Sequence, residues 1–141
     1  MKRKIIIDCD PGHDDMLAIM VAVANPDKLD LLGVTTVSGN QTIEKVTRNA
    51  LEIINFLGVD VPVHMGAVSP LVRTVDIGKG KEIHGETGLG GYVLPKSKNE
   101  VASTDAVSFM YKAIMDSKEK VTLVPTGPLT NIALLLKVHP D

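Results

Sequence analysis

An apolar strand that runs directly into a cluster of aspartates is the feature of this sequence that most restricts its fold. Ile5–Ile7 have the character of a buried strand, and Pro11-Gly12 end it before a helical pattern begins near Asp14. Asp10, Asp14 and Asp15 should therefore share one tight turn. Neighbouring carboxylates raise one another's pKa and destabilise a fold unless a positive charge neutralises them. Because the turn offers only carboxylate oxygens, the sequence predicts a hard divalent cation there.

The rest of the chain alternates between short apolar runs and helical patterns. Further strands are expected at 29–37, 61–63 and 121–124, and helices at 14–24, 42–57, 104–116 and 129–138, with Gly58 ending the second helix and Ser103 or Thr104 capping the third. Residues 66–101 lack clear periodicity and contain many Pro and Gly residues, so a long loop is expected there. This alternation predicts an α/β fold, an open and mostly parallel sheet with helices on both faces, in a single domain over residues 1–141.

Composition narrows the class of protein. The chain has 141 residues, a net charge of −2 and only four aromatic side chains, so neither nucleic acid nor an anionic membrane is expected as a partner. No run of about 18 apolar residues occurs, which excludes an evident membrane span. The single cysteine, Cys9, is expected in the core, and a cytoplasmic location is expected because no signal peptide is apparent. An uncovered apolar edge of the sheet predicts either a larger unit or a homo-oligomer.

Polar residues follow each expected strand. In open parallel sheets, ligands bind beyond the carboxyl ends of the strands, and these residues would share that rim. They are the aspartates of the first turn, Ser38-Gly39-Asn40, His64-Met65-Gly66 and Thr126-Gly127-Pro128. Simpler interpretations stay open for each: Asp14, Asp15 and Asn40 as helix caps, Thr126 as a turn residue, and His84 as a solvated loop residue in a Gly-rich flap.

Four segments resemble the inosine-uridine-preferring nucleoside hydrolases. Asp8-Cys9-Asp10-Pro11-Gly12-His13-Asp14-Asp15 is similar to the D-x-D-P-G-x-D-D signature of that family. Gly39-Asn40 matches a glycine-asparagine pair after the second strand. The segment that begins at His84-Gly85 resembles an H-G-x-x-G-L loop, and Thr126–Asn131 resembles T-G-P-L-T-N. The four motifs stand in the family's order and cover essentially the whole chain.

The resemblance implies a role for each matching residue. Asp10 and Asp15 would hold Ca²⁺ through their side chains and Thr126 through its carbonyl oxygen. Asp10 would also take a proton from the attacking water. Asp14 and Asn40 would bind the ribose hydroxyls, and His84 would lie near the nucleobase. The implied reaction is hydrolysis of the N-glycosidic bond of a ribonucleoside to ribose and free base, by an enzyme that forms dimers or tetramers.

The resemblance also implies a longer chain, roughly twice this length for a fold of this class. The second half of such a chain would supply another aspartate ligand, further ribose contacts and the group that protonates the leaving base. This chain is therefore expected to be the N-terminal part of a nucleoside hydrolase domain and, alone, to turn over slowly or not at all.

Two rival interpretations remain. Asp8-Cys9-Asp10 after an apolar strand also resembles the first motif of haloacid-dehalogenase-type phosphohydrolases, in which Asp8 would accept the phosphoryl group and Mg²⁺ would replace Ca²⁺. Gly12 stands where that family places a Thr. The second rival is a catalytically incomplete module that binds a cation or ribose without catalysis.

Overall fold

The computed structural model describes residues 2–74 and 77–140. Its elements follow one another in the order β1 (Arg3–Cys9), α1 (His13–Ala24), β2 (Leu29–Thr36), α2 (Ile43–Leu57), β3 (Val63–Met65), α3 (Ile77–His84), α4 (Ala106–Met115), β4 (Val121–Pro125) and α5 (Thr130–Val138). Strand and helix alternate over most of the chain, as the apolar patterns predict.

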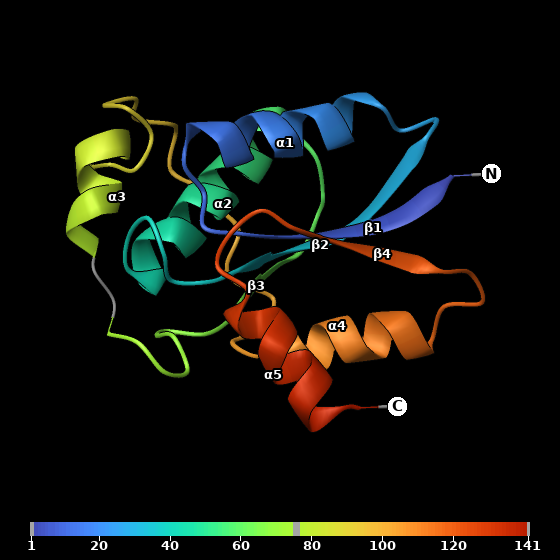
Figure 1. Cartoon of the computed structure of the whole chain (residues 1–141). Helices are drawn as coiled ribbons and strands as arrows, with labels where there is room; N and C mark the ends of the chain where they lie inside the picture. Colours follow the sequence, from blue (N-terminus) through green and yellow to red (C-terminus); the bar gives the residue numbers. More distant parts are fainter. Residues whose placement is uncertain (1, 75–76, 141) are drawn as a thin grey trace.

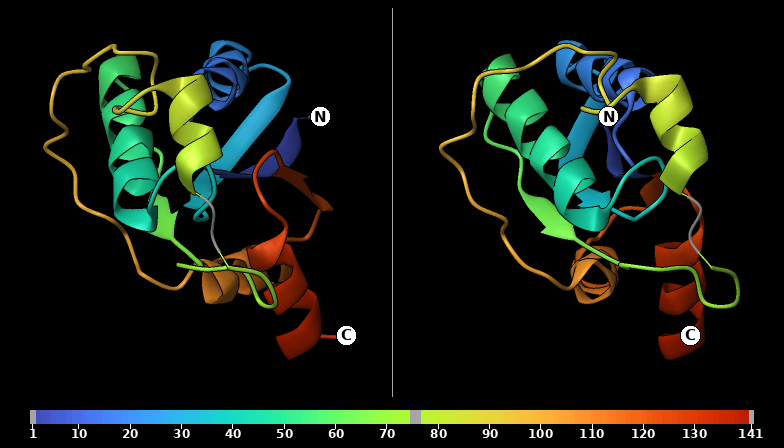
Figure 2. Two further views of the ribbon diagram at one scale, coloured as in Figure 1. Left: turned by 60° about the vertical axis from the view of Figure 1, so that its left-hand side comes forward. Right: turned by 90° about the vertical axis from the view of Figure 1, so that its left-hand side faces the viewer.

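The strands form one parallel sheet in the order β3-β2-β1-β4. β1 lies in the interior of the sheet, where Asp8 is level with Thr35 of β2 and with Pro125 of β4. Because every strand points the same way, all four carboxyl ends meet at one edge. α1 and α2 cover one face of the sheet and α4 and α5 the other, while α3 lies beyond the carboxyl ends (Figure 1; Figure 2).

Alternation along β1 divides the core into two layers. Ile5, Ile7 and Cys9 point toward α1 and α2, and Ile6 points toward α4 and α5. Gly33 of β2 leaves room for the Phe109 ring of α4, since a Cβ at Gly33 would overlap that ring. A strand with apolar side chains on both faces is the kind that a helix-covered parallel sheet requires.

Three details differ from the sequence-based expectation or sharpen it. The expected loop at 66–101 contains α3, which the sequence analysis missed because two glycines and a weak apolar pattern hide the helix. The cap of α4 is Asp105, not Ser103 or Thr104, and its side chain accepts a hydrogen bond from the Ser108 amide. Gly58 ends α2 in the left-handed conformation, with φ of 67°, as expected.

Across the part of the chain that the structure describes, none of the helices combines the length and the apolar character needed to cross a lipid bilayer.

Candidate active site

The carboxyl end of β1 is fastened to the strands on both sides of it. The amides of Thr126 and Gly127, just after β4, donate to the Asp8 carbonyl at 2.9 and 3.3 Å. On the other side, the Val37 amide after β2 donates to the Cys9 carbonyl at 3.0 Å. The segments that follow β1, β2 and β4 therefore meet at one rim, which is where the sequence predicted a site.

Asp10 occupies the centre of this rim and is only 6% exposed. The Asn40 amide donates to Asp10 Oδ2 at 2.7 Å, and Asn40 Nδ2 donates to the Asp10 carbonyl at 2.9 Å. Gly39 and Gly127 lie against the two carboxylate oxygens so closely that a Cβ at either position would overlap one of them. Asn40 thus holds Asp10 by two hydrogen bonds, one to the carboxylate and one to the backbone carbonyl, and two glycines enclose the carboxylate.

Asp15, in the first turn of α1, is 2% exposed and ties that turn to the strand ends. Its Oδ2 accepts a hydrogen bond from the Asp10 amide at 3.2 Å. The Gly12 backbone and the Thr126 side chain lie close enough to this carboxylate to lower its pKa against the effect of burial. One buried carboxylate therefore connects α1, the β1 turn and the β4 turn.

The electrostatics of the rim favour neutralisation of these acids. Burial, opposed by the Asn40 amide and reinforced by the charge of Asp15, raises the pKa of Asp10 to about 7. Burial likewise raises the pKa of Asp15, with the neighbouring Asp14 charge as a further cause. Carboxyls in this condition either hold a proton or gain from a nearby cation.

Asp8 has a different environment from the other acids of the motif. It is 0% exposed, and its Oδ1 accepts hydrogen bonds from Thr35 Oγ1 at 2.5 Å and from Asn131 Nδ2 at 2.8 Å. Burial raises its pKa, and Oδ2 has no partner among the described residues. An enclosed carboxyl of this kind is not presented to a phosphoryl donor, so the geometry does not favour the phosphohydrolase interpretation.

Asp14 and His84 complete the set of residues that the sequence singled out. Asp14 is exposed in the first turn of α1, with its Oδ1 near Gly12. His84, at the end of α3, is 9% exposed and packs over Gly12, and its Nδ1 lies 2.9 Å from Nδ1 of His13. His84 is therefore not a solvated loop residue, because its ring covers the acidic turn.

The simpler interpretations as helix caps do not hold. Gly12 is the N-cap of α1, so Asp14 and Asp15 lie inside the first turn. Thr42 is the N-cap of α2, which leaves Asn40 free to hold Asp10. Thr126, in contrast, does lie in a turn before the last helix, as its simpler interpretation had it, since Leu129 is the N-cap of α5.

Sequence reasoning did not find the polar side chains that support the rim. Asn131 is 0% exposed and joins three strand ends: its Nδ2 donates to Asp8 and to the Thr36 carbonyl at 2.9 Å, and its Oδ1 accepts from the Ala67 amide at 2.9 Å. Asn49 similarly bridges the Pro11 and Thr87 carbonyls. The only sequence signal for Asn131 was its position at the end of the Thr126–Asn131 motif. Asn49 had no such signal, because it lies within an amphipathic helix and belongs to none of the four motifs.

The donor set of the rim suits an oxygen-seeking cation. It combines the two buried carboxylates of Asp10 and Asp15 with the turn at Thr126, whose side chain already contacts Asp15. Within residues 2–74 and 77–140, no group of three or more His, Cys, Asp or Glu side chains is arranged to hold a metal ion. A cation here would therefore depend on carbonyl, water or substrate oxygens in addition to the two carboxylates.

Comparison with known proteins identifies the family of this chain. The profile of the family described as inosine-uridine preferring nucleoside hydrolase matches residues 5–141. The pyrimidine-specific ribonucleoside hydrolase RihA of Photobacterium profundum is 54% identical over 140 residues, which is 99% of this chain and 44% of that protein. The pyrimidine-specific ribonucleoside hydrolase RihB of Escherichia coli is 46% identical over 139 residues, again 99% of this chain and 44% of that protein.

The fold is also that of solved nucleoside hydrolases. The purine-preferring ribonucleoside hydrolase from Gardnerella vaginalis superposes with a TM-score of 0.91 at 35% identity, over 98% of this chain and 44% of that one. The chain belongs to the inosine-uridine preferring nucleoside hydrolase family. It spans a little under half the length of the curated relatives that it matches.

Proposed function

We propose that this chain forms the cation-binding and ribose-binding part of the active site of a ribonucleoside hydrolase, as the N-terminal part of a nucleoside hydrolase domain. The reaction is hydrolysis of the N-glycosidic bond to give ribose and a free base. The family match over residues 5–141 and the relatives named as ribonucleoside hydrolases support this proposal.

The observation that carries it is the convergence on Asp10. Asp15, Asn40 and Thr126, from the segments after β1, β2 and β4, gather around Asp10. The Asn40 amide donates to the Asp10 carboxylate, Asp15 accepts from the Asp10 amide, and the Thr126 side chain lies against Asp15. Burial holds the pKa of Asp10 at about 7. A carboxyl with a pKa near neutrality, at a rim where ligands bind, is suited to act as a general base.

Each residue then has a chemical role. Asp10 and Asp15, with the carbonyl of Thr126, would hold Ca²⁺, which when bound would orient a water and lower its pKa. Asp10 accepts the proton of the attacking water. Asp14 and Asn40 hydrogen-bond the ribose hydroxyls, and His84 lies beside the nucleobase. The negative charge at the rim favours the positive charge that develops on the sugar ring as the glycosidic bond breaks.

The relatives also guide the choice of substrate. The RihA and RihB relatives are named as specific for pyrimidine ribonucleosides, whereas the Gardnerella structure is named as purine-preferring. Because the pyrimidine-specific relatives have the higher identity, we propose uridine and cytidine as the first substrates to test. We further propose a cytoplasmic enzyme that assembles as a homo-oligomer.

Calcium titration by isothermal calorimetry tests the core of the proposal. The purified chain is expected to bind one Ca²⁺, and Asp10→Asn is expected to weaken binding by more than about tenfold, because losing even an outer partner of a metal costs about that much. Asp27→Asn is the matched control, since Asp27 is an exposed residue just before β2, at the opposite end of the sheet. Absence of Ca²⁺ binding by the unaltered chain, or equal affinity in both variants, would contradict the proposal.

A binding module without catalysis is the second candidate. Within the described residues, no group of three or more His, Cys, Asp or Glu side chains is arranged to hold a metal ion, so a cation at this rim would need further oxygens. Calcium binding with no release of ribose from uridine or inosine is the result expected of such a module.

A further inference from the structure

Three donors, one just before α2 and two in its first two turns, hold three successive carbonyls of the loop that follows α3. Gln41 Nε2 donates to the Gly85 carbonyl at 3.0 Å, Lys45 Nζ to the Glu86 carbonyl at 3.3 Å, and Asn49 Nδ2 to the Thr87 carbonyl at 3.0 Å. The donors are four residues apart, so they lie along one side of the helix. The loop that begins at His84 therefore runs along α2, and each of three consecutive loop carbonyls accepts from a side chain one helical turn further on.

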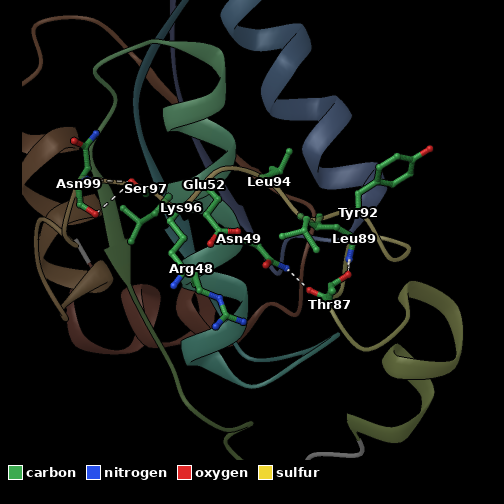
Figure 3. A pocket seen from close by; sticks show the side chains of 12 residues that line it. Arg48, Asn49, Glu52, Thr87, Leu89, Tyr92, Leu94, Lys96, Ser97 and Asn99 are labelled. Atoms are coloured by element: carbon green, nitrogen blue, oxygen red, sulfur yellow. Dashed lines mark hydrogen bonds between the residues drawn. The ribbon is translucent and has the colours of Figure 1, made fainter.

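Asn49 differs from the other two donors because it also reaches the acidic turn. The same Nδ2 donates to the Pro11 carbonyl at 3.2 Å, directly after Asp10 in the chain. Asn49 is 3% exposed, and a side-chain amide has two N–H groups, one for each carbonyl. Figure 3 shows the Asn49 side chain extending from α2 toward Thr87, with the hydrogen bond drawn.

The loop that Asn49 holds is braced internally. The Gly90 amide donates to the His84 carbonyl at 2.8 Å, and the amides of Leu89 and Gly91 donate to Thr87 Oγ1 at 3.2 and 3.3 Å. His84 and Thr87 therefore belong to one cross-linked segment. A shift of Thr87 away from α2 would carry the His84 ring away from Gly12 and from His13.

We propose that Asn49 is a positioning residue that fixes the separation between the acidic turn, through Pro11, and the His84 loop, through Thr87. It acts through His84, and what His84 does at that position rests on the function proposed above. The fit is close, since a Cβ on Gly88 would come within 2.9 Å of Asn49 Nδ2.

Asn49→Leu tests the proposal because leucine has a similar volume and no donor. Two readouts report the loop directly: amide hydrogen exchange of Gly88 and Gly90, and the ring ¹⁵N signals of His84 and His13 in NMR spectra. We expect exchange at both glycines to accelerate by about tenfold or more, because one buried and one partly buried hydrogen bond are lost, and we expect the His84 ring signal to move. Asn55→Leu, near the other end of α2, is the matched control and should leave both readouts unchanged.

A second variant, Gly88→Ala in the loop, tests the same contact in case Asn49→Leu impairs the folding of α2. Gly88→Ala leaves α2 intact but forces a Cβ against Asn49 at a backbone φ of 79°, so it should produce the same two changes. Amides of β1 and β2 should keep their protection in every variant, which a general loss of stability would not allow. Unchanged loop exchange and an unchanged His84 signal in either Asn49→Leu or Gly88→Ala would overturn the proposal.

These readouts need no cation and no turnover, so they separate the two proposals. If the unaltered chain fails to bind Ca²⁺, the proposed function fails, yet the loop measurements still decide the role of Asn49. If the chain binds Ca²⁺ and the loop does not respond to Asn49→Leu, only the positioning role is lost.

Discussion

Burial makes the stability of the fold depend on the protonation of the Asp10 carboxyl. Burial raises its pKa from 3.8 to about 7, so the folded, metal-free chain keeps a proton that the unfolded chain releases at much lower pH. Over that interval the folded state binds more protons than the unfolded state, and the free energy of unfolding therefore falls as pH rises from about 4 to about 7.

Asp10→Asn tests this linkage. In EDTA, the variant should be more stable relative to the unaltered chain at pH 8 than at pH 4.5, because the amide cannot acquire the buried charge. Urea unfolding at the two pH values measures the difference, with Asp27→Asn as the control. A residual pH dependence should persist, since burial also raises the pKa of Asp8 and Asp15. Identical pH profiles for the variant and the unaltered chain would contradict the account of Asp10.

The residues at the rim were largely predictable from the sequence, and the residues behind it were not. Asp10, Asp15, Asn40 and Thr126 follow strand ends, and parallel strands bring their carboxyl ends together whatever the details of packing. Asn49 and Asn131 instead donate to backbone carbonyls of segments distant in the chain. No local pattern encodes such contacts, because they exist only once the helices have docked.

At the scale of single elements, α4 offers a clear test of capping. Asp105→Ala should cost about 1 kcal/mol of stability, as loss of an N-cap usually does, and Asp105→Asn should cost much less because an asparagine oxygen still accepts from the Ser108 amide. Thermal unfolding at neutral pH measures both. Equal losses in the two variants would show that the cap bond contributes little.

The contribution of the Asp105 cap to stability should decrease at acidic pH. Hydrogen bonds from Ser108 lower the pKa of Asp105, so its contribution to stability is complete above about pH 4 and is lost as pH falls through the lowered pKa. The difference between Asp105→Asn and the unaltered chain should therefore shrink in acid.

The fold was predictable where hydrophobic periodicity is strong and not where it is weak. The helical stripe of α2 and the buried run of β1 are both long enough to identify from pattern alone. β1 nonetheless extends to Arg3 and Cys9, because strand pairing continues through polar positions such as Asp8 once neighbouring strands are present. α3 has no such pattern, and its position beyond the strand ends depends on contacts with the rim.

At the scale of the whole molecule, an apolar groove of about 470 Å³ between α1 and the sheet remains uncovered. Leu17 and Val21, on its α1 side, are 58% and 60% exposed, and Val124 on β4 lies opposite. A contiguous exposed apolar surface usually marks a contact with further protein. The RihA relative is a longer protein, since this chain matches 44% of it.

Turnover by the isolated chain is the corresponding test. We expect release of ribose from uridine, cytidine or inosine to be very slow or absent in the presence of Ca²⁺, because the family resemblance implies that a longer chain supplies the group that protonates the leaving base. A reducing-sugar assay run beside the RihA relative from Photobacterium profundum, and repeated in EDTA, makes the comparison. Substantial calcium-dependent turnover by the 141-residue chain would refute this expectation.

The position of the Asp10 carboxylate depends on the absence of a side chain at Gly39 and at Gly127. Neither glycine has a positive φ, so the backbone alone would accept another residue at either position. The carboxylate of Asp10 would not, since even one added methyl group meets its oxygens. In a mutational scan selected for cation binding, both positions should reject every replacement, including alanine, because any side chain there would displace the Asp10 carboxylate from its present position.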